Sequence, residues 1–240
     1  MPSFWVAAAL AATLHAAPPP QVTAPPNPFS HIFQNLATDA RALGTVNTAI
    51  VMGFGGAGAL AAHNNDTRVH DWAVAQPPDP GVATFGNFIG NGFIQGGAAT
   101  AAWAVGKTRK DVRLETTGSD LIRAQVLNGV LTQGMKLIAN RTRPDGGSNS
   151  FPSGHASATF ATAAVIQRDY GIAASVPFYA LGGLVSWSRV RTSHHWLSDV
   201  VFGGAIGITS GLAATNGRTS HWSVVPVKTS GGAALYVIRR

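Results

Sequence analysis

Apolar and polar positions alternate in blocks along this chain of 240 residues. After Ala37, apolar blocks separated by short polar breaks predict helices over 38–62, 81–105, 119–138, 154–168, 171–187 and 196–215. The clearest period lies in 119–138, where apolar residues recur mostly at steps of three and four. Ser119 or Asp120 is a suitable N-cap for that helix. The pattern therefore predicts an all-α fold, a helical bundle of about six core helices.

The two ends of the chain have different patterns. The last twenty residues predict a short C-terminal β-hairpin, two strands around a Gly-Gly turn. At the N-terminus, an apolar stretch from Phe4 to Leu14 and small residues near Ala17 resemble a secretory signal peptide, although no Lys or Arg precedes the stretch. An N-terminal anchor is the alternative. The predicted organisation is a signal peptide at 1–17, a Pro-rich linker at 18–32, a helical domain at 33–218 and a strand-like tail at 219–240.

Composition narrows the class of protein. Apolar residues make up 45% of the chain and charged residues 11%, which excludes disorder over the whole length. The net charge of +7 suits anionic ligands or membrane surfaces without choosing between them. No run of basic residues interleaved with aromatic ones indicates nucleic-acid binding. Since the chain has no Cys, disulfides and thiol chemistry are excluded.

Whether the helices cross a membrane is left open by the sequence. The ranges 45–62, 81–106, 171–187 and 200–216 contain no charged residue and have lengths suited to a bilayer. They are rich in Gly and Ala, however, and the mean hydropathy of the chain is only +0.14. The basic run GKTRKDVR would be cytoplasmic by the positive-inside rule, which conflicts with a cleaved signal peptide. We expect an exported periplasmic or extracellular protein; the alternative is a multi-pass inner-membrane protein whose site faces the periplasm.

Three stretches carry candidate chemistry, and the first is KLIANRTRP. Lys136 and Arg143 are seven residues apart, which is nearly two helical turns. Two cations directed at one point need an anion between them, because they otherwise repel each other. The alternative is a basic helix C-terminus favoured by the helix dipole.

The second stretch is PSGH, Pro152 to His155, at the predicted start of a helix. Gly154 lets a ligand approach the backbone, and the free N–H groups of a helix start suit a phosphate. His155 is a proton donor near neutral pH. A turn followed by a Ser cap is the simpler alternative.

The third stretch is SRVRTSHHWLSD, Ser188 to Asp199. His195 and Asp199 are four apart, so on a helix they share one face. An Asp that accepts the imidazole Nδ1–H leaves Nε2 as a nucleophile, whereas His194 has Ser four residues later. Arg189, before the predicted helix, offers a planar guanidinium for phosphate oxygens. The alternative is a capped helix with an ordinary ion pair.

Together, the three stretches resemble the signature of the type 2 phosphatidic acid phosphatase superfamily, which includes bacterial nonspecific acid phosphatases and vanadium-dependent haloperoxidases. The resemblance covers roughly residues 120 to 215, and the link between Pro144 and Pro152 is shorter than in many members. The matching residues are Lys136, Arg143, Pro144, Ser153, Gly154, His155, Arg189, His195 and Asp199.

The resemblance implies a role for each matching residue. His195 attacks phosphorus and forms a phosphohistidine, and Asp199 orients His195. His155 protonates the leaving alkoxide and then activates water. The phosphate is bound by Lys136, Arg143, Ser153, the Gly154 N–H and Arg189.

The implied function is a metal-independent phosphatase without a cofactor, acting on a phosphorylated lipid or a small phosphate ester. The alternatives are a vanadate-dependent haloperoxidase and a non-catalytic phospholipid-binding protein. A further polar stretch, HNNDTRVHD, holds metal-binding residue types, His63, Asp66, His70 and Asp71, at irregular spacing. We interpret that stretch as a polar loop between helices and predict no metal site.

Overall fold

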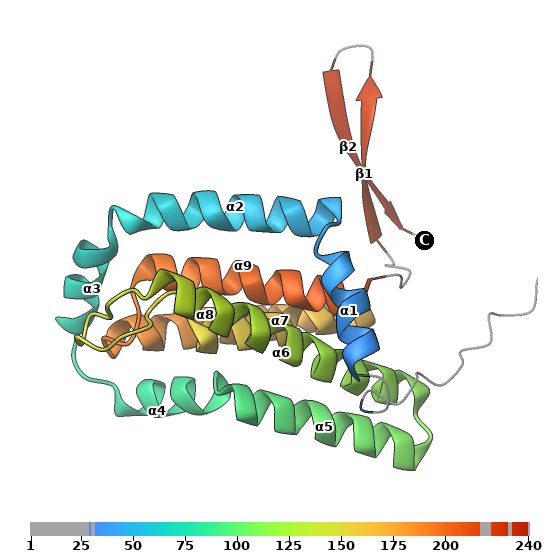
Figure 1. Cartoon of the computed structure of the whole chain (residues 1–240), viewed down its shortest axis with the longest axis horizontal. Coiled ribbons are helices and arrows are strands. Elements are labelled where there is room, and N and C mark those ends of the chain that lie inside the picture. Colours follow the sequence, from blue (N-terminus) through green and yellow to red (C-terminus); the bar gives the residue numbers. More distant parts are fainter. Residues whose placement is uncertain (1–28, 30–31, 217–221, 230–231, 240) are drawn as a thin grey trace, which may run out of the picture.

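The computed structural model describes residue 29 and residues 32–216, 222–229 and 232–239. The predicted signal peptide and nearly all of the predicted linker lie outside these residues. The described residues form nine helices and one pair of strands (Figure 1). The helices are α1 (Ile32–Ala42), α2 (Val46–His63), α3 (Asp66–Val74), α4 (Pro80–Ile89), α5 (Gly92–Arg109), α6 (Val112–Ala139), α7 (Gly154–Tyr170), α8 (Ile172–Arg191) and α9 (Leu197–Ala214). The all-α prediction is confirmed.

The end strands pair as the sequence predicted. Strand β1 (Trp222–Thr229) runs antiparallel to β2 (Gly232–Arg239), with Val225 opposite Tyr236. The two strands are joined through residues 230–231, where the sequence predicts a turn.

Two predicted helices are each broken into two. The range 38–62 contains the end of α1 and most of α2, which meet at an angle of 67° at Gly44 and Thr45. The range 81–105 is divided into α4 and α5, because the Asn91 side chain accepts hydrogen bonds from the nitrogens of Phe93 and Ile94 and so starts a new helix. Each of these four helices is thus shorter than the apolar block that predicted it.

The central helix α6 extends further than predicted. It begins at Val112 instead of 119, because Asp111 caps it by accepting a hydrogen bond from the nitrogen of Leu114 over 3.0 Å. It ends at Ala139, and Asn140 adopts a left-handed conformation with φ 39°. The chain therefore turns away from α6 at Asn140, shortly after Lys136.

Glycines allow α7 and α9 to pack with their backbones close together. A Cβ atom added at Gly207 would lie 2.1 Å from the Ser157 carbonyl oxygen, and one at Gly203 would lie 2.6 Å from the Ser153 carbonyl oxygen. Such distances exclude any side chain at these positions without movement of a helix. The close packing fixes the start of α9 against the start of α7.

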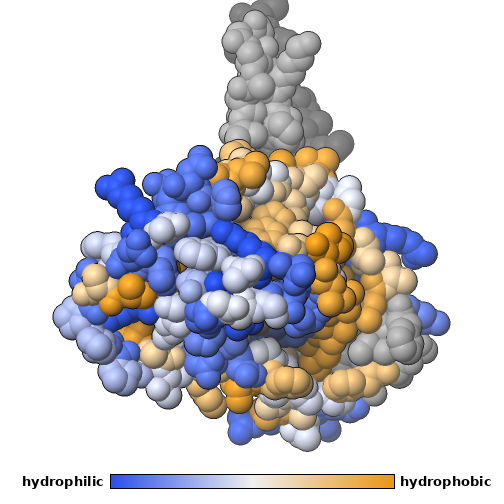
Figure 2. Space-filling view, turned by 60° about the vertical axis from the view of Figure 1, so that its left-hand side comes forward, coloured by the Kyte–Doolittle hydropathy of each residue, from blue (hydrophilic) through white to orange (hydrophobic). Residues whose placement is uncertain are grey.

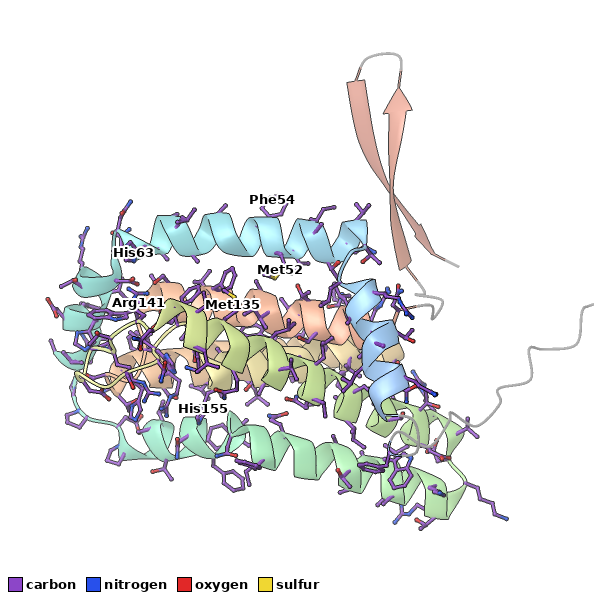
Figure 3. All side chains as sticks on the ribbon, viewed as in Figure 1. Met52, Phe54, His63, Met135, Arg141 and His155 are labelled. Atoms are coloured by element: carbon purple, nitrogen blue, oxygen red, sulfur yellow. The ribbon has the colours of Figure 1, made fainter. Side chains whose placement is uncertain are left out.

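Apolar side chains are also exposed on the outside of the bundle. Phe54 on α2 is 78% exposed and points away from the other helices (Figure 3), and Phe93 on α5 is 92% exposed. Figure 2 shows hydrophilic residues gathered on the end of the bundle that is turned forward, bordered by hydrophobic ones.

Within the described residues, few helices are long and apolar enough to span a membrane. Helix α9 passes both criteria, but 72% of it is buried inside the protein. The bent pair Gln34–Ala42 and Val46–His63 passes only when its two helices are taken together.

Candidate active site

The three predicted stretches meet at one end of the bundle, where α6 ends and α7 and α9 begin. Main-chain hydrogen bonds tie them together: the nitrogen of Asp145 donates to the carbonyl of Ser193 over 3.0 Å. The nitrogen of Ser153 donates to the carbonyl of Asp199, also over 3.0 Å. Residues more than forty positions apart in sequence are therefore held in a fixed arrangement.

Three cationic side chains converge there, as the sequence predicted. The charge of Arg143 acts on both Lys136 and Arg189. Burial, together with Arg143, lowers the pKa of Lys136 to about 8 and the pKa of Arg189 to about 10, while Asp199 opposes the shift at Lys136 and Asp145 opposes it at Arg189. The cations thus disfavour one another's charged forms.

No carboxylate neutralises these three cations. The ion pairs found in the described part of the chain include none with Lys136, Arg143 or Arg189. Lys136 donates instead to the Asn149 carbonyl over 2.5 Å, and Arg189 donates to the Asn87 side-chain oxygen over 3.1 Å. The Nε atoms of Arg143 and Arg189 are buried without a hydrogen-bond partner. This arrangement suits an anion with several oxygens, such as phosphate.

His195 and Asp199 are brought together, but not as the sequence predicted. His195 precedes α9 instead of lying on it, and Asp199 is at the third position of that helix. Nδ1 of His195 still lies 3.5 Å from Oδ2 of Asp199. Both side chains are buried, and burial, opposed by Asp199, lowers the pKa of His195 to about 4. His195 is therefore neutral at physiological pH.

His155 lies in the first turn of α7, at the same end of the bundle as Arg141 and His63 (Figure 3). Its Nε2 atom is buried without a hydrogen-bond partner. Burial and the charges of Arg189 and His195 lower the pKa of His155 to about 4, against a hydrogen bond to the Asn87 backbone. The sequence suggested a donor near neutral pH; burial first, and the neighbouring charges second, place the pKa of His155 below that range.

The remaining predicted residues also lie at this end. Ser153 is fully buried, and its hydroxyl oxygen caps α7 by accepting from the nitrogen of Ala156. A Cβ atom at Gly154 would meet only Thr132, at 3.7 Å, so space remains beside the backbone. Arg189 was expected before a helix but lies in the last turn of α8. His194 bonds to the Thr192 carbonyl within its own loop, consistent with the choice of His195.

Sequence reasoning missed several residues of this region. Arg141 lies between two predicted site residues and forms ion pairs with Asp66 and Asp199. The Ser150 hydroxyl donates to Asp199, and Asn87 contacts Arg189 from α4. A second Arg in the KLIANRTRP stretch was the one available signal; nothing in the sequence connects Asp66 or Asn87 to the site.

The HNNDTRVHD stretch is not the polar loop that the sequence suggested. Asp66 is buried and begins α3, where the Ser198 nitrogen and hydroxyl both donate to its carboxylate, over 2.8 and 2.6 Å. In the part of the chain that the structure describes, no group of three or more His, Cys, Asp or Glu residues is placed to hold a metal ion.

The fold and the site together define a helical bundle with three cationic side chains gathered at one end, beside a buried histidine and carboxylate. Residues 145–222 match the sequence profile of the PAP2 superfamily. This match covers the second and third of the three motifs and confirms the resemblance inferred from them.

Known proteins extend this comparison. Over 97 residues the chain is 37% identical to the lipid A 1-phosphatase of Porphyromonas gingivalis, which covers 39% of this chain and 22% of that protein. The match thus spans about a fifth of the relative's length.

A solved structure also resembles the chain in fold. The crystal structure of Aquifex aeolicus LpxE has a TM-score of 0.51 at 19% identity, over 62% of this chain and 93% of that one. The transmembrane PAP2-type phosphatidylglycerolphosphate phosphatase of Bacillus subtilis is more distant, with a TM-score of 0.37 at 18% identity, over 78% of this chain and 94% of that one.

Proposed function

We propose that this protein is a phosphatase that hydrolyses phosphate monoesters through a phosphohistidine on His195. The observation that carries the proposal is the group of three cations without carboxylate partners, Lys136, Arg143 and Arg189, beside the buried His195–Asp199 pair. Phosphoryl transfer needs positioning and charge stabilisation, and this group of residues supplies both.

In the proposed first step, Asp199 accepts the Nδ1–H of His195, and the neutral Nε2 attacks phosphorus. The bond between phosphorus and the ester oxygen breaks, and His155 gives its proton to the leaving alkoxide. In the second step, His155 removes a proton from water, whose oxygen attacks the phosphohistidine. Inorganic phosphate leaves and His195 is regenerated, so atoms and protons balance.

The two histidines need opposite protonation states at the start. The pKa of His195, lowered to about 4 mainly by burial, makes it a neutral nucleophile. His155 must be protonated, although burial and Arg189 lower its pKa in the unliganded protein. A bound phosphate dianion offsets the charges of the cations and so raises the pKa of His155. Substrate binding itself then charges the general acid.

We propose a lipid phosphate as the substrate. A cavity of about 560 Å³ opens among α2, α8 and α9, and most of its lining is apolar. Along α9 this lining runs from Leu197, two positions after His195, to Ile208. An acyl chain beside a phosphate site fits this arrangement. The relative from P. gingivalis is a lipid A 1-phosphatase, which points to the same substrate class.

We also propose that the protein is exported and associates with a membrane. The exposed apolar side chains of α2 and α5, Phe54 and Phe93 among them, suit contact with lipid. Fractionation of cells that produce the protein tests this. Recovery in the soluble cytoplasm contradicts the proposal, and membrane recovery that resists alkaline carbonate favours the multi-pass alternative.

Phosphate release by the purified protein tests the proposed reaction. The substrates are phosphatidic acid, an isoprenoid diphosphate and p-nitrophenyl phosphate, each with a chelator, and the controls are His195→Ala and His155→Ala. We expect release that both substitutions abolish, with the lipid substrates preferred. Activity that survives His195→Ala contradicts the nucleophile. Bromide oxidation with vanadate and peroxide, without phosphate release, assigns the site to a haloperoxidase instead.

A further inference from the structure

Arg141 contacts two buried carboxylates at once. Its Nη2 lies 2.7 Å from Oδ2 of Asp66, and its Nη1 lies 2.7 Å from Oδ1 of Asp199. The same Nη1 donates to the Ser198 hydroxyl over 2.7 Å. The two carboxyl side chains are 5% and 0% exposed, so neither has water as an alternative partner.

These contacts separate Arg141 from the three site cations. The guanidinium of Arg141 forms ion pairs with two carboxylates, whereas Lys136, Arg143 and Arg189 form no ion pair with any described residue. A cation already paired in this way is a poor phosphate ligand, because an anion would compete with two short, charge-assisted hydrogen bonds. Arg141 and Arg143 are only two positions apart, but their different partners indicate different roles.

The hydrogen bonds that the two carboxylate oxygens of Asp199 accept indicate the role of Arg141. Oδ1 accepts from Arg141, while Oδ2 accepts from the Ser150 hydroxyl and from the Trp196 nitrogen, the latter over 2.9 Å. His195 faces the same Oδ2 at 3.5 Å. Arg141 therefore holds the oxygen that the histidine does not use and fixes the plane of the carboxylate.

We propose that Arg141 is a positioning residue that orients Asp199 toward His195, and that Asp66 in turn holds Arg141. This inference rests on the proposed function, since it concerns the same His195–Asp199 pair. Asp66 also fixes the start of α9, because it accepts from the nitrogen and the hydroxyl of Ser198. A helix outside the three motifs, α3, thereby takes part in aligning the nucleophile.

Arg141→Gln and Arg143→Gln separate the two kinds of arginine. The assay is hydrolysis of p-nitrophenyl phosphate, combined with calorimetric binding of inorganic phosphate. We expect Arg141→Gln to lower kcat about 10- to 100-fold, which is the usual loss when a residue that orients a functional side chain is replaced. Its KM and phosphate affinity should stay within about twofold of the parent values, because no phosphate ligand is lost. Arg143→Gln should weaken phosphate binding.

Two further variants guard against simple misfolding. Arg141→Lys keeps the charge but loses the planar fork that reaches both carboxylates, so kcat should fall while phosphate affinity and the melting temperature are kept. Asp66→Asn should lower kcat in the same way, and the effects of Asp66→Asn and Arg141→Gln should be non-additive. Arg68→Gln, on the exposed side of α3, is the matched control and should behave like the parent protein.

The outcomes distinguish this inference from the proposed function. Activity that survives His195→Ala overturns both. Activity that depends on His195 but is unchanged in Arg141→Gln and Arg141→Lys overturns the positioning role alone. Equal loss of phosphate affinity in Arg141→Gln and Arg143→Gln also overturns it, since Arg141 would then be a phosphate ligand.

Discussion

The nitrogen of Ser153 and the carbonyl of Asp199 share a main-chain hydrogen bond of 3.0 Å. This bond joins the residue that caps α7 to the first turn of α9. His155 follows the first partner by two positions and His195 precedes the second by four. The spacing of the two histidines therefore depends on how closely α7 and α9 pack.

Gly207→Ala tests that dependence. The new Cβ would lie 2.1 Å from the Ser157 carbonyl oxygen and 2.9 Å from the Ala161 nitrogen, so the two helices must separate. We expect the free energy of unfolding to fall by about 1–3 kcal/mol, as for other overpacked cores. Urea denaturation measures the loss, and kcat should fall with it.

Gly129→Ala is the matched control, because a Cβ there meets nothing within 4 Å. This substitution in the interior of α6 should leave stability unchanged or raise it by up to about 1 kcal/mol. Equal losses from both glycine substitutions would contradict the packing argument.

The protein should lose stability in mild acid. Burial lowers the pKa of both His155 and His195 from 6.5 to about 4, so the folded protein binds fewer protons there than the unfolded chain between these pH values. The free energy of unfolding should therefore fall as the pH falls, by up to about 1.4 kcal/mol per pH unit per histidine, and by less for the partly solvated His155.

Urea denaturation between about pH 5 and pH 7 measures this slope. His195→Gln should make the slope shallower, since one depressed pKa is removed. Added inorganic phosphate should counteract the loss. A slope that is the same in the variant and the parent would exclude His195 as its source.

Arg123 anchors the first helix to the core. It forms ion pairs with Asp39 of α1 at 3.1 Å and with Asp120 of α6 at 3.0 Å, and both carboxylates are buried. Arg123→Met should lower the free energy of unfolding by about 3–5 kcal/mol, because the buried Asp39 and Asp120 carboxylates lose their ion pairs with Arg123. Thermal denaturation checks this, with Arg109→Met at the end of α5, which forms no ion pair in the described part of the chain, as the control. A melting temperature unchanged in Arg123→Met would contradict the anchor.

Hydrolysis should not need a divalent metal ion. Three cations already stabilise the charge that metal ions stabilise in other phosphoryl-transfer enzymes. Activity should be the same with and without a chelator. Activity lost to the chelator and restored by a divalent ion would contradict the mechanism.

Motif spacing predicted much of the site, and the outcome for each residue has a physical reason. Lys136 and Arg143 converge because α6 ends at Ala139, and a polar loop turns the second cation back toward the first. His195 and Asp199 meet even though His195 is not helical. The spacing predicted the correct pair of residues, but the argument assumed that both lie on a helix. The two side chains still meet, because a residue just before a helix also reaches the first turn of that helix.

The supporting residues that sequence reasoning missed include two from segments far from the motifs in sequence. Asp66 and Asn87 belong to α3 and α4, whose contacts with the site are tertiary and leave no periodic signal. The helix breaks at Gly44 and Asn91 were missed for a related reason. Gly and Asn within an apolar block fit both a continuous helix and a break. The Asn91 side chain caps α5, whereas no side-chain cap hydrogen bond marks the start of α2.

The ends of α6, α7, α8 and α9 and the loops between them hold all the proposed catalytic and phosphate-binding groups, within residues 136–199. Of the earlier helices, α2 contributes one wall of the apolar cavity, and α3 and α4 contribute supporting contacts from Asp66 and Asn87. Changes in α2 can therefore reshape one wall of the cavity without altering the residues of the proposed chemistry. Exchange of α2 between relatives should redirect such an enzyme to a new ester without rebuilding its phosphate site.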